Sequence, residues 1–171
     1  MKRLIIKFSL ALLLCQSTEA KIAPHFQGDL LGGGRASLTE LLEKAQTQKH
    51  ALLVCFWATW CTPCMQELKA VADKMMLDKS IPLDVLTVNV DTSETSTDVK
   101  PTLKLYKFDL PVVLDPKHEI FSKYQDSKTL PFSVLISPKG DIAETFSGYN
   151  EDMFSKIKQV AGGTKETNAQ N

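Results

Sequence analysis

The clearest hydrophobic pattern is a pair of continuous apolar runs, Ala51–Trp57 and residues 83–90. Each run is typical of a strand that is buried on both faces of a sheet. Between the runs, apolar residues recur at helical spacing and predict a helix from beside Cys61 to about Leu77. The apolar face of this helix comprises Met65, Leu68, Val71, Ala72, Met75 and Met76.

Shorter patterns predict the other helices. Ser37-Leu38-Thr39-Glu40 is a capping box that begins a helix. We expect further helices over residues 99–108 and 117–124, separated by a short strand at residues 111–114. Asn150 is expected to cap the last helix, and Gly162 and Gly163 to end it.

Two apolar segments near the C-terminal end, residues 132–136 and 142–146, flank the turn sequence Ser137-Pro138-Lys139-Gly140. They are expected to form a β-hairpin. Strands and helices alternate before this hairpin, and a helix follows it. The chain is therefore predicted to be an α/β protein with a central mixed sheet that helices flank.

The first twenty residues have the pattern of a secretory signal peptide. Lys2 and Arg3 precede an apolar stretch at residues 8–15, and small residues precede a cleavage site after Ala20. The mature protein would then begin at Lys21. We expect residues 21–163 to form the folded domain and residues 164–171 to be a polar tail.

Two alternatives for this segment stay open. The first is an uncleaved membrane anchor, although the apolar stretch is short for a bilayer crossing. The second is a lipoprotein acylated at Cys15, where Leu14 occupies a position that usually holds a small residue. In each case the domain would be exported to the periplasm or to the outer face of the membrane.

Charge excludes one class of partner. The chain has 20 basic and 20 acidic side chains, so its formal net charge is zero. This balance lacks the basic excess of a nucleic-acid-binding domain.

The cysteines point to redox chemistry. Four cysteines are too few for a disulfide scaffold, and two of them form the motif Cys61-Thr62-Pro63-Cys64. Cys61 is expected at a helix N-terminus, where backbone N–H groups favour a thiolate. Cys64 follows one turn later, within reach of a disulfide after small adjustment. The prediction is a redox-active pair.

The same two cysteines could be half of a zinc site. Tetrahedral zinc needs two further ligands. The chain has three histidines and no second paired motif, so we expect no metal, and we expect no cofactor.

The segment Phe56-Trp57-Ala58-Thr59-Trp60-Cys61-Thr62-Pro63-Cys64 resembles the active-site segment of thioredoxin-like proteins of the exported TlpA/ResA type. Weaker similarities extend the resemblance over most of residues 23–161. It implies a thioredoxin-like fold with an extra helix inserted before the third core strand.

The resemblance also implies a substrate-binding surface. Pro131 is expected to follow a cis peptide bond and to stand opposite Cys61, with Leu130 where the family usually has a small or β-branched residue. Its loop would bind an extended substrate segment by strand addition. Trp60 is expected beside the site as part of the same surface.

Glu67 is the third candidate catalytic residue. It follows Cys64 by three residues and therefore shares its helix face. The resemblance implies a role in proton transfer at Cys64; the alternative is a solvated acid that complements the helix dipole. Cys55 stands where thioredoxins have a buried aspartate, and we expect it to be a small buried apolar residue.

The resulting hypothesis is an extracytoplasmic enzyme that reduces disulfides in exported proteins. The resemblance suggests cytochrome c maturation or a similar task, with a membrane-linked thiol partner as electron donor. A disulfide oxidant or isomerase and a redox-inactive peptide-binding domain stay open as alternatives. A peroxiredoxin is excluded, because its P-x-x-x-[TS]-x-x-C pattern would require Pro at Val54 and Thr or Ser at Ala58.

Overall fold

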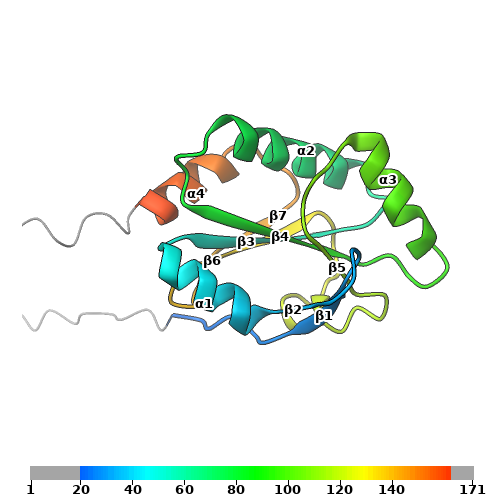
Figure 1. Cartoon of the computed structure of the whole chain (residues 1–171), viewed down its shortest axis with the longest axis horizontal. Coiled ribbons are helices and arrows are strands. Elements are labelled where there is room, and N and C mark those ends of the chain that lie inside the picture. The colour runs from blue at the N-terminus through cyan, green and yellow to red at the C-terminus, as the bar shows by residue number, and fades with distance from the viewer. Residues whose placement is uncertain (1–19, 163–171) are drawn as a thin grey trace, which may run out of the picture.

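The long apolar run of the sequence forms β3 (Ala51–Trp57), whose seven side chains are all buried. In the computed structural model, which describes residues 20–162, β3 lies near the middle of a seven-stranded mixed sheet (Figure 1). It pairs in parallel with β4 (Leu83–Asn89) and antiparallel with β6 (Phe132–Ile136). The two predicted buried strands are therefore neighbours.

The remaining strands extend the sheet on both sides, in the order β2-β1-β5-β4-β3-β6-β7. β5 (Val112–Leu114) lies parallel to β4. The hairpin of β1 (Gln27–Leu30) and β2 (Arg35–Ser37) continues this edge antiparallel. β7 (Ile142–Ser147) forms the predicted hairpin with β6 and is the other edge.

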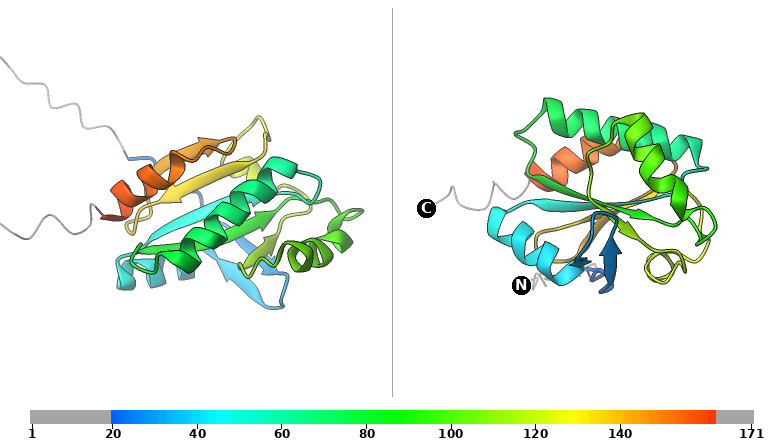
Figure 2. Two further views of the ribbon diagram at one scale, coloured as in Figure 1. Left: turned by 90° about the horizontal axis from the view of Figure 1, so that it is seen from above. Right: turned by 45° about the vertical axis from the view of Figure 1, so that its right-hand side comes forward.

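Helices cover both faces of the sheet. α1 (Leu38–Gln48) packs on one face, and the Ser37 hydroxyl caps it as the capping box predicts. α2 (Thr62–Leu77), α3 (Val99–Tyr106) and α4 (Met153–Gly162) lie on the other face (Figure 2). α3 precedes β5, which confirms the expected extra helix.

One predicted helix is wrong. Residues 117–124 contain only a single 3₁₀ turn, Phe121–Lys123. His118 adopts a positive φ of 58°, which an α-helix cannot include. The Asp115 carboxylate accepts a hydrogen bond from the Ile120 N–H at 3.1 Å, so a local side-chain cap replaces the start of a longer helix.

Two other helix boundaries differ from the prediction. α3 ends at Tyr106 because Lys107 takes the left-handed conformation. Asn150 accepts a hydrogen bond from the Asp152 N–H, so it caps a turn that leads into α4. Residues 1–19 of the proposed signal segment, which include Cys15, lie outside the described residues, as do Gly163 and the polar tail.

The start of the described chain is attached to the turn between β6 and β7. The Ala23 N–H donates to the Gly140 carbonyl at 2.9 Å, and the Ile142 N–H donates to the Lys21 carbonyl at 2.7 Å. Because β6 runs antiparallel to β3, this turn lies at the amino end of β3. The helices of residues 20–162 include none with the length and apolar character of a bilayer crossing.

Candidate active site

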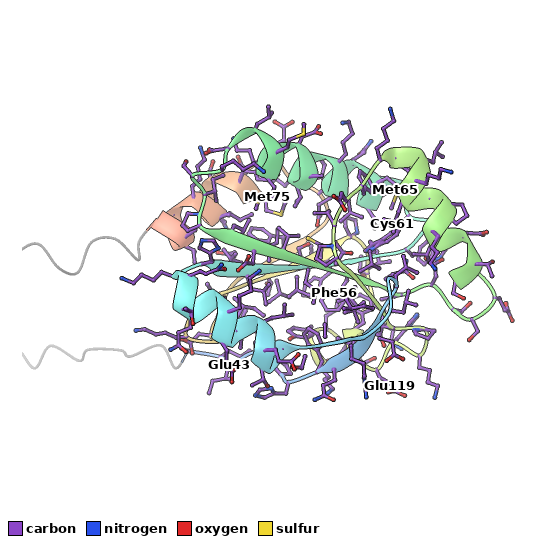
Figure 3. All side chains as sticks on the ribbon, viewed as in Figure 1. Glu43, Phe56, Cys61, Met65, Met75 and Glu119 are labelled. Atoms are coloured by element: carbon purple, nitrogen blue, oxygen red, sulfur yellow. A yellow bond between two sulfur atoms is a disulfide. The ribbon has the colours of Figure 1, made fainter. Side chains whose placement is uncertain are left out.

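Cys61 and Cys64 form a disulfide where the chain passes from β3 into α2. Cys61 is the N-cap residue of α2, and its Sγ accepts a hydrogen bond from the Cys64 N–H at 3.3 Å. Pro63 lies in the first turn, where the missing N–H removes no helical hydrogen bond. Figure 3 shows Cys61 at the end of the molecule near α3.

The two cysteines differ slightly in exposure. Cys61 exposes 5% of its surface and Cys64 1%. This small difference favours Cys61 as the cysteine that a substrate would reach first. Its thiolate would face the unpaired N–H groups and the positive end of the helix dipole.

A buried carboxylate fixes the turn that precedes the pair. Asp91 accepts hydrogen bonds from the Thr59 N–H at 2.8 Å and the Thr59 hydroxyl at 2.7 Å. The Asn89 amide donates to the same carboxylate at 2.7 Å. The sequence analysis missed Asp91. The available signal was an acid placed directly after a buried strand, at the sheet edge where the pair lies.

Trp60 is exposed over 66% of its surface, in the same turn. It lines a shallow depression between this turn and α3. The other lining residues are Thr59, Thr95, Asp98, Pro101, Thr102 and Leu105. Trp60 therefore lies on the surface beside the redox pair, and its contact with a substrate stays a prediction.

The Leu130–Pro131 peptide bond is cis, as the resemblance implies. β6 begins at the next residue, Phe132, which pairs with Phe56 at the carboxyl end of β3. The proline loop and the Cys61 turn therefore lie at the same end of the sheet. Leu130 is half-buried against the apolar core.

Glu67 is not a solvated acid; only 1% of its surface is exposed. The Ser133 hydroxyl donates to its Oε1, and the Cys55 thiol also forms a hydrogen bond with it. Burial raises the pKa of Glu67 to about 7, and the bonds from Ser133 and Cys55 oppose that rise. The carboxyl can therefore exchange a proton near neutral pH.

Cys55 is buried, as expected, but it is more than a small apolar residue, because its thiol contacts Ser133 and Glu67. Burial, followed by the charge of Glu67, raises the pKa of Cys55 far above its usual value. This cysteine therefore stays protonated. Across residues 20–162, no group of three or more His, Cys, Asp or Glu side chains could hold a metal ion.

Similarity to known proteins agrees with this site. The AhpC/TSA family model matches residues 20–145. The thiol-disulfide oxidoreductase ResA of Bacillus subtilis is 31% identical over 131 residues, 77% of this chain and 68% of that protein. The sporulation thiol-disulfide oxidoreductase A of the same organism is 35% identical over 94 residues, 54% of this chain and 56% of that protein.

Solved structures confirm the thioredoxin-like fold. StoA from Bacillus subtilis superposes with a TM-score of 0.62 at 26% identity, over 79% of this chain and 96% of that one. A thiol:disulfide interchange protein of the thioredoxin family from Chlorobium tepidum gives 0.67 at 23% identity, over 84% and 97%.

Proposed function

Since the chain belongs to the AhpC/TSA family and is a thiol–disulfide oxidoreductase, we propose that it works outside the cytoplasm and reduces disulfides in exported proteins. The observation that carries this proposal is the Cys61–Cys64 disulfide, with Cys61 as the N-cap of α2. Trp60, Leu130 and Pro131 surround the same end of the sheet and would contact the substrate chain.

The first step is attack on the substrate. In the reduced enzyme the Cys61 thiolate attacks one sulfur of the substrate disulfide. A Cys61–substrate bond forms, the substrate S–S bond breaks, and the leaving thiolate takes a proton from solvent. The helix N-terminus and the Cys64 N–H stabilise the attacking thiolate before this step.

The second step releases the substrate. Glu67 accepts the proton of Cys64, and the Cys64 thiolate attacks the Sγ of Cys61. The intramolecular disulfide forms, the mixed disulfide breaks, and the second substrate thiolate leaves and is protonated. The substrate has gained two electrons and two protons. A thiol partner linked to the membrane would then reduce the Cys61–Cys64 bond again.

The reduction potential of the pair tests this direction. Equilibration with dithiothreitol or glutathione buffers, followed by thiol alkylation and mass spectrometry, measures it. We expect a value nearer to about −270 mV, as in thioredoxin, than to about −120 mV, as in DsbA. A value near that of DsbA would make the protein an oxidant.

For the substrate, we propose cytochrome c maturation as the first task to test. Its signature is the haem-attachment motif C-x-x-C-H, which can be oxidised to a disulfide. An oxidised peptide with this motif should be reduced faster than a peptide of the same composition with a scrambled order around its cysteines. Equal rates would contradict a specific role in this pathway.

A further inference from the structure

A row of polar side chains crosses the core beneath the redox pair. Cys55 on β3 pairs with Thr87 on β4 and with Ser133 on β6. Paired residues on adjacent strands share one face of a sheet. All three are at most 1% exposed, so each of their polar groups needs a partner within the protein.

The three residues use their polar groups differently. The Thr87 hydroxyl donates to the Pro111 carbonyl at 3.0 Å and is occupied by the backbone. The Ser133 hydroxyl and the Cys55 thiol instead bond to the Glu67 carboxylate, which α2 brings onto this face. Two donors from two strands thus hold one acid of the helix.

One oxygen of the Glu67 carboxylate has no hydrogen bond. Its Oε2 is buried and has no hydrogen-bond partner in the described structure. A buried acceptor that stays unpaired destabilises the protein, and a charged acceptor does so more strongly. Cys64 precedes Glu67 by three residues, on the same helix face, and is equally buried. Its thiol, once the disulfide is reduced, is the donor that suits this oxygen.

We propose that Cys55 and Ser133 are positioning residues: they hold the Glu67 carboxylate with its second oxygen turned to Cys64, and Cys55 takes no part in disulfide exchange. This inference rests on the proposed role of Glu67 as the proton acceptor. It assigns to Cys55 a function that a small buried apolar residue would lack.

The protonation states support this assignment. Thiol–disulfide exchange requires a thiolate, and burial together with the charge of Glu67 raises the pKa of Cys55, so its proton stays in place for donation. The donors in turn oppose the rise that burial causes in the pKa of Glu67. Without them the acid would be protonated at neutral pH and could accept no proton.

The other titratable groups around Glu67 come from two elements. Cys61 and Cys64 lie at the start of its own helix, joined by the disulfide. Tyr149, in the segment after β7, has a pKa raised by burial and then by the charges of Glu151 and Glu67. The titration is therefore followed on the carboxyl ¹³C signal of Glu67 itself, which these groups do not share.

The test is a titration of the Glu67 side-chain carboxyl by ¹³C NMR in the oxidised, full-length protein. In the unmodified protein we expect a midpoint at about pH 7. Cys55→Val, which keeps the size but loses the donor, should move it up by about one to two pH units, because the charged carboxylate loses a hydrogen bond. Ser133→Ala should do the same.

Two further variants control for packing. Cys55→Ser keeps a donor and should hold the midpoint at or below that of the unmodified protein. Val54→Ala removes a neighbouring core side chain on the opposite face of β3 and should leave it unchanged. A midpoint that stays at pH 7 in both Cys55→Val and Ser133→Ala would overturn the proposal.

A kinetic measurement separates this inference from the proposed function. The rate at which Cys64 resolves a mixed disulfide should fall at acid pH, as Glu67 becomes protonated. In Cys55→Val this fall should occur at a higher pH, and the shift should equal that of the NMR midpoint. If the NMR midpoint moves and the rate profile does not, Glu67 is not the proton acceptor, and the positioning role falls with it. A mixed disulfide found on Cys55 during turnover would also overturn the proposal.

Discussion

At the scale of single residues, burial decides when Glu67 carries a charge and what that charge costs. Its pKa rises from 4.5 in the unfolded chain to about 7 in the folded one. Between these values the unfolded chain ionises first, so the free energy of unfolding falls as pH rises from about 4.5 to 7. The whole effect is roughly 3 kcal/mol, and it is fully present above pH 7.

Glu67→Gln should remove this pH-dependent cost. Relative to the parent protein, the variant should gain roughly 3 kcal/mol in unfolding free energy between pH 4.5 and pH 8, measured by urea denaturation. It should also slow the resolving step above pH 7 and flatten its pH profile. A stability difference that is equal at both pH values would show that Glu67 does not titrate in this range. An unchanged pH–rate profile would remove its catalytic role.

The two cysteines of the pair should behave differently. Cys61→Ser should abolish turnover, whereas Cys64→Ser should accumulate a mixed disulfide between Cys61 and substrate, because only the resolving thiol is missing. Mass spectrometry of the trapped complex identifies the linkage. Faster labelling of Cys64 than of Cys61 by iodoacetamide, in the reduced protein, would reverse the assignment.

The spacing of Cys61, Cys64 and Glu67 could be predicted from the sequence, because helix geometry alone places them on one face. The environment of Glu67 could not. Its partners Cys55 and Ser133 come from strands 12 and 66 residues away along the chain, and no local pattern encodes their meeting.

At the scale of elements, the connection from β3 to α2 is held by a side chain from the segment that follows β4. Asp91 follows β4 and binds both the amide and the hydroxyl of Thr59. Two adjacent parallel strands thus end in one hydrogen-bonded unit. This unit sets the position at which α2 begins and therefore the position of Cys61.

Asp91→Asn should loosen that unit. The asparagine NH₂ group would replace one carboxylate oxygen and would face a hydrogen-bond donor that this oxygen now accepts from. We therefore expect a loss of about 2 kcal/mol in unfolding free energy and slower attack by Cys61. Asp109→Asn makes the same chemical change at an exposed position outside the depression beside Trp60 and should alter neither quantity. Urea denaturation and single-turnover kinetics compare the two, and equal stabilities would contradict the role of Asp91.

Continuous patterns at this scale were predictable, and the side-chain cap formed by Asp115 was not. β3, α2 and the β6–β7 hairpin follow from long apolar runs or clear turn signals. The helix expected over residues 117–124 fails because Asp115 bonds to backbone N–H groups five and six residues ahead, and it forms a tight turn in their place. Sequence periodicity contains no information on such a contact.

At the scale of the whole molecule, the residue directly after the expected cleavage site is part of the hydrogen-bonded structure. Lys21 and Ala23 make backbone hydrogen bonds to the β6–β7 turn. A cut directly before Lys21 would keep both residues in the mature chain and would remove neither hydrogen bond.

We therefore expect the mature protein from its native host to begin at Lys21, outside the cytoplasm. Intact-mass spectrometry of the purified protein checks this. A lipid-modified species that starts at Cys15 would identify a lipoprotein, and a mass that includes residues 1–20 would identify an uncleaved anchor. Either species would contradict the expected cleavage.

The attachment of Lys21 to the β6–β7 turn also sets the direction in which the domain faces. This turn lies at the amino end of β3 and the redox pair at its carboxyl end, roughly 20 Å apart along a seven-residue strand. Whatever precedes Lys21 leaves from the pole opposite the cysteines. A tether to a lipid surface would therefore present the redox pair outward, and proteins that diffuse past would meet it first. An electron donor embedded in that surface would have to reach around the domain or wait until the domain rotates.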